Sequence, residues 1–319
     1  ANDSDLFRTD EELEAQGLTL EGNCFVEGDD VYLPLYEAKM IALFDHRASE
    51  VVLSDTAVIR QGQPRDLTKA EHQRPSELPM PRYWTDSGDV NLALPKGFDG
   101  EWFQGFANVT SPTNHRTMIT AIIPKSGVGH SMPLILHPKD AGILRRLCFF
   151  ASFASFPFDY VGRQKLGGIN YTFYILKQLP VLPPERYSSE LLDFIVPRVV
   201  ELTYTAWDLQ PFARDVLDEV GEETWARWFA DAPVHTSPPP DWAPGSTPPP
   251  FVWDEERRAR LRAELDALYG HLYGLTREEL AYILDTFPIV RRKDEAKYGE
   301  YRTKRMVLET YEEVEPLMR

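Results

Sequence analysis

Cysteine and long apolar runs are scarce in this sequence. Of its 319 residues only two are cysteines, Cys24 and Cys148, which lie far apart. This usage argues against a disulfide framework or a zinc site and is typical of a reducing compartment, so we expect a cytoplasmic protein. No apolar run approaches the roughly 20 residues that a membrane-spanning helix needs, and no signal peptide opens the chain, so no membrane partner is expected. The seven histidines show no metal-ligand spacing, and no metal site is expected.

Positive charge is also in deficit, but unevenly along the chain. The formal net charge is −16 at pH 7, which at first sight opposes binding to nucleic acid. Residues 1–60 hold 14 acidic and 4 basic residues, and residues 181–319 hold 27 and 17, so each end carries −10. Residues 61–180 hold 9 acidic and 13 basic residues, a local charge of +4. Unless this is ordinary fluctuation, only the middle segment is suited to lie on phosphates.

The best-formed unit is expected at residues 98–186. Within it, residues 117–123 predict a strand, residues 138–154 a helix opened by proline, and residues 171–176 a second strand. The sequence therefore predicts a mixed α+β fold, with a twisted sheet and packed helices in this unit.

The flanking regions have different patterns. Residues 1–97 predict a connecting region with short strands, of which residues 61–97 form a long irregular connection. Residues 187–319 predict a mostly helical C-terminal region. A stiff strap is expected at residues 233–250, which hold 8 of the 26 prolines. Further helices are expected at residues 253–273 and after the capping box of Thr276 and Glu279.

Six short motifs occur in order along the chain. They read LYEAKMI with FDHR at residues 35–47, PRYW at 81–84, TNHRT at 113–117, FDYVGRQKLGG at 158–168, KQLPVLPP at 177–184 and LYGLTREEL at 272–280. Together they resemble the large restriction-modification methylases of the type IIG kind and related methylases of phage-defence systems. The resemblance runs from about residue 31 over nearly the whole chain. The chain departs from it at Ala38 (usually glycine), at Gly162 (usually alanine) and at Phe156-Pro157, which interrupts a helix.

The resemblance implies a DNA adenine-N6 methyltransferase that uses S-adenosylmethionine and whose N-terminal catalytic domain is missing here. What remains resembles the target-recognition domain and its C-terminal helices. The first residue, Ala1, fits a chain that starts within a longer protein as well as removal of an initiator methionine. The implied partners are duplex DNA and the missing methyltransferase domain of the same protein, and S-adenosylmethionine would bind to that parent protein.

The motifs for methyl transfer are missing from the sequence. Gly127 and Gly129 follow an expected strand, but no helix starts directly after them, so an ordinary turn is a better interpretation than a cofactor loop. The proline runs at residues 182–185 and 237–240 lack the aromatic residue that stacks on a flipped adenine. We therefore expect no catalytic residue and no cofactor in this chain, which is predicted to be inactive alone.

Ten residues are predicted to contact DNA, because they combine base-reading side chains, phosphate-binding charges and glycines that permit close approach. They are Asn114, Arg116, Thr117, Lys125, Arg163, Gln164, Lys165, Gly167, Gly168 and Asn170. Two structural alternatives stay open: Arg116 also suits an ion pair with an internal carboxylate, and Gly167 with Gly168 suits a helix C-cap.

Two other functions compete with DNA recognition. Asp285, Glu295 and Lys297 match the loose spacing of metal-dependent nucleases, although a solvated charge run has the same composition. The net charge of −16 also suits an acidic protein-interaction module or a DNA mimic. Residues 44–47 (FDHR) hold an aspartate and a histidine without a second ligand nearby, and a structural turn is favoured there.

Overall fold

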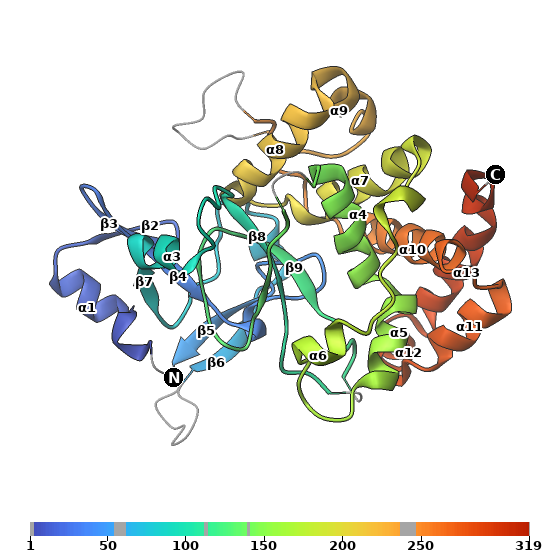
Figure 1. The fold of residues 1–319 in the computed structure, drawn as a ribbon, viewed down its shortest axis with the longest axis horizontal. Coiled ribbons are helices and arrows are strands. Elements are labelled where there is room, and N and C mark those ends of the chain that lie inside the picture. The colour runs from blue at the N-terminus through green and yellow to red at the C-terminus, as the bar shows by residue number, and fades with distance from the viewer. Residues whose placement is uncertain (1–2, 54–61, 112–113, 139–140, 237–246, 319) are drawn as a thin grey trace.

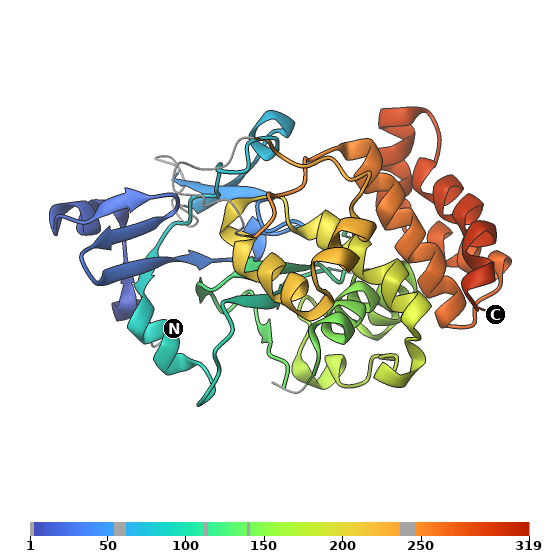
Figure 2. The same ribbon diagram turned by 90° about the horizontal axis from the view of Figure 1, so that it is seen from above.

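The computed structural model describes residues 3–53, 62–111, 114–138, 141–236 and 247–318. It has a mixed α+β fold, which confirms the expected fold class. The short sheets lie toward one end of the molecule and the C-terminal helices toward the other (Figure 1, Figure 2).

Within the described residues, the strands form three small sheets. The largest has the order β1 (Phe7–Arg8), β7 (Trp84–Asp86), β4 (Asp30–Tyr36), β3 (Cys24–Glu27) and β2 (Thr19–Glu21), and β10 (Gly127–Val128) pairs with β4 in parallel. An antiparallel sheet has the order β11 (Leu134–Ile135), β8 (Trp102–Phe106) and β9 (Thr120–Pro124), and β5 (Ser49–Leu53) pairs with β6 (Gly62–Asp66).

Gly127 was expected to lie in a turn, but it forms the strand β10 with Val128. A β-carbon at Gly127 would lie 2.5 Å from Cγ2 of Thr85, so only glycine fits where this strand packs beside the sheet. The glycine therefore serves packing between strands.

Helices occur along the whole chain and dominate its second half. The helices are α1 (Asp10–Ala15), α2 (Lys69–His72), α3 (Ser87–Ala93), α4 (Ile143–Ala154), α5 (Phe156–Lys165), α6 (Phe173–Leu176), α7 (Ser189–Thr203), α8 (Gln210–Val220), α9 (Glu222–Trp228), α10 (Glu255–Leu272), α11 (Arg277–Asp285), α12 (Pro288–Tyr298) and α13 (Arg302–Val314). Within the described residues, every helix is too short or too polar to span a bilayer.

Local sequence signals set several helix boundaries. Thr276 and Glu279 form the predicted capping box at the start of α11, where each side chain accepts a hydrogen bond from the backbone N–H of the other. Pro157 lies in the first turn of α5, where a proline costs no hydrogen bond, and Ser155 separates α4 from α5. The interruption expected at Phe156-Pro157 is therefore a helix boundary.

Three local predictions were wrong. Residues 171–176 were expected to form a strand, but the Thr172 side chain caps α6 instead, and an isolated bridge pairs Val109 with Asn170 just before this segment. Residues 61–97 contain β6, α2, β7 and α3, because Thr68 and Asp86 cap the two helices. The helix expected from Pro138 begins at Ile143.

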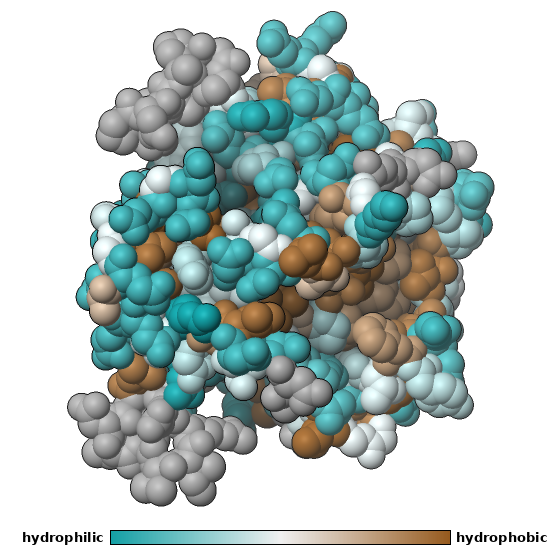
Figure 3. Space-filling model, turned by 60° about the vertical axis from the view of Figure 1, so that its left-hand side comes forward, coloured by the Kyte–Doolittle hydropathy of each residue, from teal (hydrophilic) through white to brown (hydrophobic). Residues whose placement is uncertain are grey.

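The polar and apolar side chains are mixed over much of the surface. Figure 3 shows a face on which hydrophilic side chains predominate and apolar ones gather toward a recessed area. Such a mixture is usual for folded proteins, so this face does not by itself indicate a partner.

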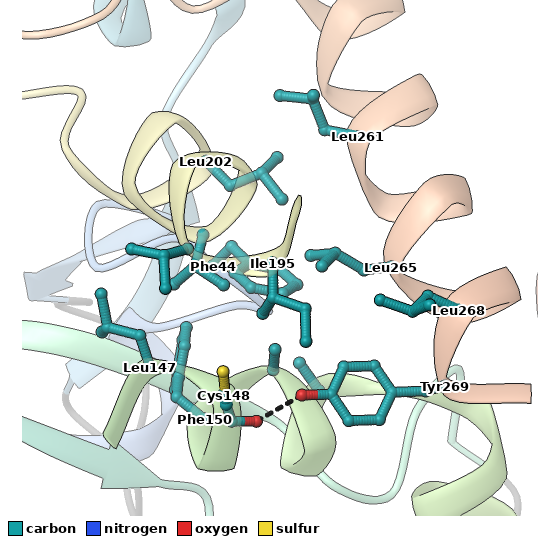
Figure 4. Close-up of a cluster of buried hydrophobic side chains, with 14 of the residues drawn as sticks. Phe44, Leu147, Cys148, Phe150, Ile195, Leu202, Leu261, Leu265, Leu268 and Tyr269 are labelled. Carbon is teal, nitrogen blue, oxygen red and sulfur yellow. Dashed lines mark hydrogen bonds between the residues drawn. The ribbon is translucent and has the colours of Figure 1, made fainter. Parts of the chain in front are cut away.

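The main apolar core joins the three expected segments of the chain. It packs α4 against α7 and α10, and it also includes Phe44 and Trp102 from before these helices. Figure 4 shows its centre, where the hydroxyl of Tyr269 on α10 donates to the carbonyl oxygen of Cys148 on α4 at 2.5 Å. A buried hydroxyl needs such an acceptor, so this bond lets a tyrosine fill the core.

The turn at residues 44–47 holds a fully buried arginine. Its Phe44 has a φ of 59°, and Ala42 and Asp45 exchange backbone hydrogen bonds. The Arg47 guanidinium donates to four carbonyl oxygens, those of His72, Arg74, Glu77 and Thr205, at 2.9–3.0 Å. Because these acceptors come from distant segments, Arg47 ties the N-terminal region to the helical region. The turn is structural, as expected.

Candidate nucleic-acid interface

Two loops lie side by side where most of the predicted DNA contacts fall. The backbone N–H of Thr110 donates to the carbonyl of Ile169 at 2.8 Å, and that of Tyr171 donates to Asn108 at 2.9 Å. The loop that leads into β9 is therefore paired with the loop that leads from α5 to α6. Backbone pairing of this kind holds loop side chains in fixed positions.

A buried carboxylate anchors the first loop from below. Asp159 on α5 accepts from Nε of Arg116 at 2.6 Å and from the backbone N–H of Thr117 at 3.1 Å, and the Thr117 hydroxyl also donates to it. Arg116 donates further to the carbonyl of Ala154 at 2.7 Å and lies 4.0 Å above the ring of Phe156.

These contacts assign Arg116 and Thr117 a structural position rather than the DNA contact expected from the sequence. Both are buried, and the polar groups named above already bind protein. The arrangement is the internal ion pair that the sequence left open as the alternative for Arg116. Removing one partner of a buried ion pair of this kind lowers the free energy of unfolding by about 3–5 kcal/mol.

Arg163 fastens the same loop to the C-terminal helices. Its guanidinium donates to the carbonyl oxygens of Asn114 and Thr286, both at 3.0 Å, and lies 4.1 Å from the ring centre of Phe287. Burial lowers the pKa of this half-buried side chain, which stays charged at neutral pH. We therefore interpret Arg163 as a structural residue that holds the loop in place, rather than as a side chain that is free to contact a base.

The remaining predicted residues of these loops are exposed. They are Asn114, Gln164, Lys165, Gly167, Gly168 and Asn170. A β-carbon at Gly167 or Gly168 would meet nothing within 4 Å, and neither glycine has the left-handed backbone of a helix C-cap. The C-cap alternative is therefore wrong, and the glycines leave an open surface that a partner's backbone can approach closely.

Exposed apolar side chains adjoin these polar residues. Val109, Ile169, Phe173 and Tyr174 are 53%, 65%, 64% and 78% exposed, which is unusual for side chains of this size. Phe173 and Tyr174 were not predicted as contacts because residues 171–176 were expected to form a strand, and no sequence pattern indicated Val109 or Ile169. The threonine before an apolar run without alternation was the available signal for a short capped helix.

We call the exposed set of both loops the loop interface. Its members are Val109, Asn114, Gln164, Lys165, Gly167, Gly168, Ile169, Asn170, Phe173, Tyr174 and Lys177. Neither residues 102–138 nor residues 160–184 contain an aspartate or glutamate, although the chain has 50. The loops themselves therefore carry no acidic side chain, although the protein is strongly acidic.

Lys125 lies outside the loop interface. It follows β9 at the end opposite the loop of Asn114, and its ammonium group pairs with Glu101 at 3.2 Å. The structure therefore does not bring this predicted DNA contact together with the others.

The nuclease residues do not converge. Asp285 ends α11 and pairs with Lys304 at 2.6 Å, whereas Glu295 on α12 pairs with Arg291 at 2.7 Å. Lys297 pairs with Glu255 at 3.3 Å. Among the described residues, no group of three or more histidine, cysteine, aspartate or glutamate side chains is arranged to hold a metal ion. The geometry therefore gives the nuclease alternative no support.

Comparisons with models of protein families, with curated proteins and with solved structures give no match. A functional assignment therefore depends on the geometry of the loop interface and on the motifs of the sequence.

Proposed function

We propose that this chain recognises duplex DNA through the loop interface. In this proposal it is the target-recognition part of an adenine-N6 methyltransferase of a restriction-modification or phage-defence system. The observation that carries the proposal is the acid-free pair of loops, which exposes lysines, amides, glycines and aromatic rings together. In a chain of net charge −16, this is a surface that a polyanion can approach.

The loop interface contains charged, amide and aromatic side chains, and each kind is suited to a different contact with DNA. Lys165 and Lys177 supply charge for phosphates, which positions a protein on DNA without reading its sequence. Asn114, Gln164 and Asn170 carry amides that donate and accept, as recognition of base edges requires. Phe173 and Tyr174 are suited to stack on a base or to wedge between base pairs.

The buried residues contribute rigidity. Recognition requires side chains on fixed supports, and Asp159 with Arg116 fixes one loop while Arg163 ties it to α11 and α12. The chemistry would come from the partner domain of the same protein, which binds S-adenosylmethionine and receives the presented adenine. This chain would then determine which DNA site is methylated and would take no part in the methyl transfer itself.

The proposal is tested by fluorescence anisotropy with the full chain and a labelled duplex of about 30 base pairs, titrated at several salt concentrations. We expect the logarithm of the binding constant to fall with the logarithm of the salt concentration. Replacing Lys165 and Lys177 together with alanine should make that slope shallower by about 2.

A matched control separates the effect of the loop-interface lysines from the effect of removing any exposed positive charge. Lys96 is exposed and lies beyond α3, so Lys96→Ala should leave both affinity and slope unchanged. Equal losses in the Lys96 and Lys165/Lys177 variants would contradict the proposal. Binding that ignores salt would contradict it as well and would favour an acidic protein-interaction module.

The methyltransferase part is tested in the intact parent gene by mapping methylated adenines in cells. We expect one methylated sequence motif, and we expect it to be lost or altered when loop-interface residues are replaced. An unmethylated genome with an intact gene would refute this part and leave DNA binding to be judged by anisotropy.

A further inference from the structure

A cavity of about 360 Å³ lies between the β8–β9 connection and the C-terminal helices, next to the loop that carries Asn114. Its walls include Arg116, Phe156 at the start of α5, Arg262 on α10, and Tyr298 on α12. This volume is in the range of small-molecule sites. The proposed recognition of DNA uses Arg116 as a support for the loop but gives the cavity itself no role.

The carboxylates in its wall are already satisfied. Asp45 bonds to the His72 ring at 3.1 Å, Glu255 to Lys297 at 3.3 Å, Asp266 to the backbone N–H of Phe156 at 2.7 Å, and Asp294 to that of Thr303 at 2.6 Å. The acids therefore have partners of their own.

The cations in the wall are satisfied with one exception. Arg116 pairs with Asp159, Arg258 donates to the carbonyls of Leu202 and Phe44, Lys297 pairs with Glu255, and Arg302 pairs with Glu256. Arg262 makes no hydrogen bond and no ion pair within the part of the chain that the structure describes. One guanidinium is thus left with no acceptor at hydrogen-bond distance, although Asp266 lies one turn further along α10.

Arg262 is an exposed residue whose side chain lines the recess beside both acidic and basic groups. The surrounding protein desolvates the guanidinium and lowers its pKa, with Asp266 offsetting and Arg116 adding to that effect. Burial, followed by the charges of Arg116 and Lys293, also lowers the pKa of His115 to about 3. His115 is therefore neutral at pH 7, whereas Arg262 remains a cation that an anion would stabilise.

We propose that this cavity binds a phosphate group through the guanidinium of Arg262. The planar guanidinium presents parallel N–H donors that match the oxygens of phosphate. The phosphate belongs either to a small molecule or to the backbone of bound DNA, and its recognition chemistry is the same. The inference does not depend on the proposed DNA recognition, because inorganic phosphate alone is a sufficient probe.

The test titrates inorganic phosphate into the full chain at low ionic strength and follows binding by calorimetry. We expect saturable binding at one site, and Arg262→Ala should weaken it by at least about tenfold, since a charge-assisted pair is lost. Arg260 is the control: it lies on the same helix, is exposed and does not line the cavity, so Arg260→Ala should bind phosphate normally. Arg262→Gln replaces the alanine variant if that variant does not fold.

The outcomes separate the two sources of phosphate. If a small molecule supplies it, Arg262→Ala loses affinity for inorganic phosphate while its affinity for duplex DNA is unchanged. If the DNA backbone supplies it, both affinities fall and phosphate competes with the duplex. Absence of saturable phosphate binding to the unaltered chain overturns the inference, as do equal losses in the Arg262 and Arg260 variants. Neither result bears on the lysine test of the loop interface.

Discussion

A β-carbon at Gly162 would lie 2.3 Å from the hydroxyl oxygen of Tyr171. Gly162 is on α5, and the buried ring of Tyr171 packs against it from the second loop of the interface. The absence of a side chain at Gly162 therefore leaves the space that the Tyr171 hydroxyl occupies. This is also the position at which the resemblance described above would have an alanine.

The first prediction concerns that contact. Gly162→Ala should lower the free energy of unfolding by about 1–3 kcal/mol, because the added methyl group forces Tyr171 out of its place. Urea denaturation measures this. Removing the hydroxyl leaves the nearest ring atom at 3.2 Å, so the double variant with Tyr171→Phe should recover part of the loss. Gly168→Ala, with open space around it, serves as the neutral control.

The second prediction concerns the ion pair beneath the loops. Arg116→Ala should lower the free energy of unfolding by about 3–5 kcal/mol, since it leaves the Asp159 carboxylate buried and unpaired. Arg305 pairs with Glu300 on the surface, and Arg305→Ala should cost less than about 1 kcal/mol. An Arg116 variant of full stability that no longer binds DNA would show instead that this arginine contacts DNA directly.

The third prediction concerns the exposed aromatic residues. Replacing Phe173 and Tyr174 with alanine should reduce affinity for duplex DNA about tenfold or more while leaving stability unchanged, because both rings are exposed and available for stacking. Anisotropy and urea denaturation measure the two quantities. Leu92 on α3 is 84% exposed, so Leu92→Ala gives the effect of removing an exposed apolar side chain elsewhere. An affinity loss no larger than that of the control would count against stacking.

The fourth prediction is a pH dependence that arises from Asp266. Burial raises the pKa of this carboxyl to about 6, above the ordinary 3.8, so the fold favours its protonated form. The resulting stabilisation is fully present below about pH 4 and is lost as the pH rises through 6, a change of about 3 kcal/mol or less.

Asp266→Asn isolates this contribution, because the amide oxygen still accepts from the N–H of Phe156 but does not titrate. The difference in unfolding free energy between the unaltered chain and the variant, measured from pH 4 to 7.5, should shift in favour of the variant as the pH rises. A difference that stays constant over this range would rule out the raised pKa.

Short-range patterns in the sequence predicted much of the helical region. The capping box at Thr276 and the proline at position 157 act within a few residues, so their signals are visible without knowledge of the fold. Six of the eleven loop-interface residues, Lys165 and Asn170 among them, were singled out from the sequence, and their contact with DNA stays a prediction.

Long-range partners could not be predicted in the same way. Arg116 and Asp159 are 43 residues apart, and only the fold decides that the arginine is neutralised inside the protein rather than offered to a ligand. Phe173 and Tyr174 were expected in a strand because aromatic residues favour strands, yet they lie in the short helix α6, whose first turn is capped by the Thr172 side chain.

The burial of Arg47 has a consequence for dissecting the chain. Its guanidinium depends on acceptors at His72 and Thr205, so removing either the N-terminal or the helical part strands a charge or leaves carbonyl groups without their donor. Fragments cut at residue 97 or 186 should therefore aggregate rather than behave as modules. Trp84 in the N-terminal region and Trp225 in the helical region should report one shared melting transition, because Arg47 couples the two regions.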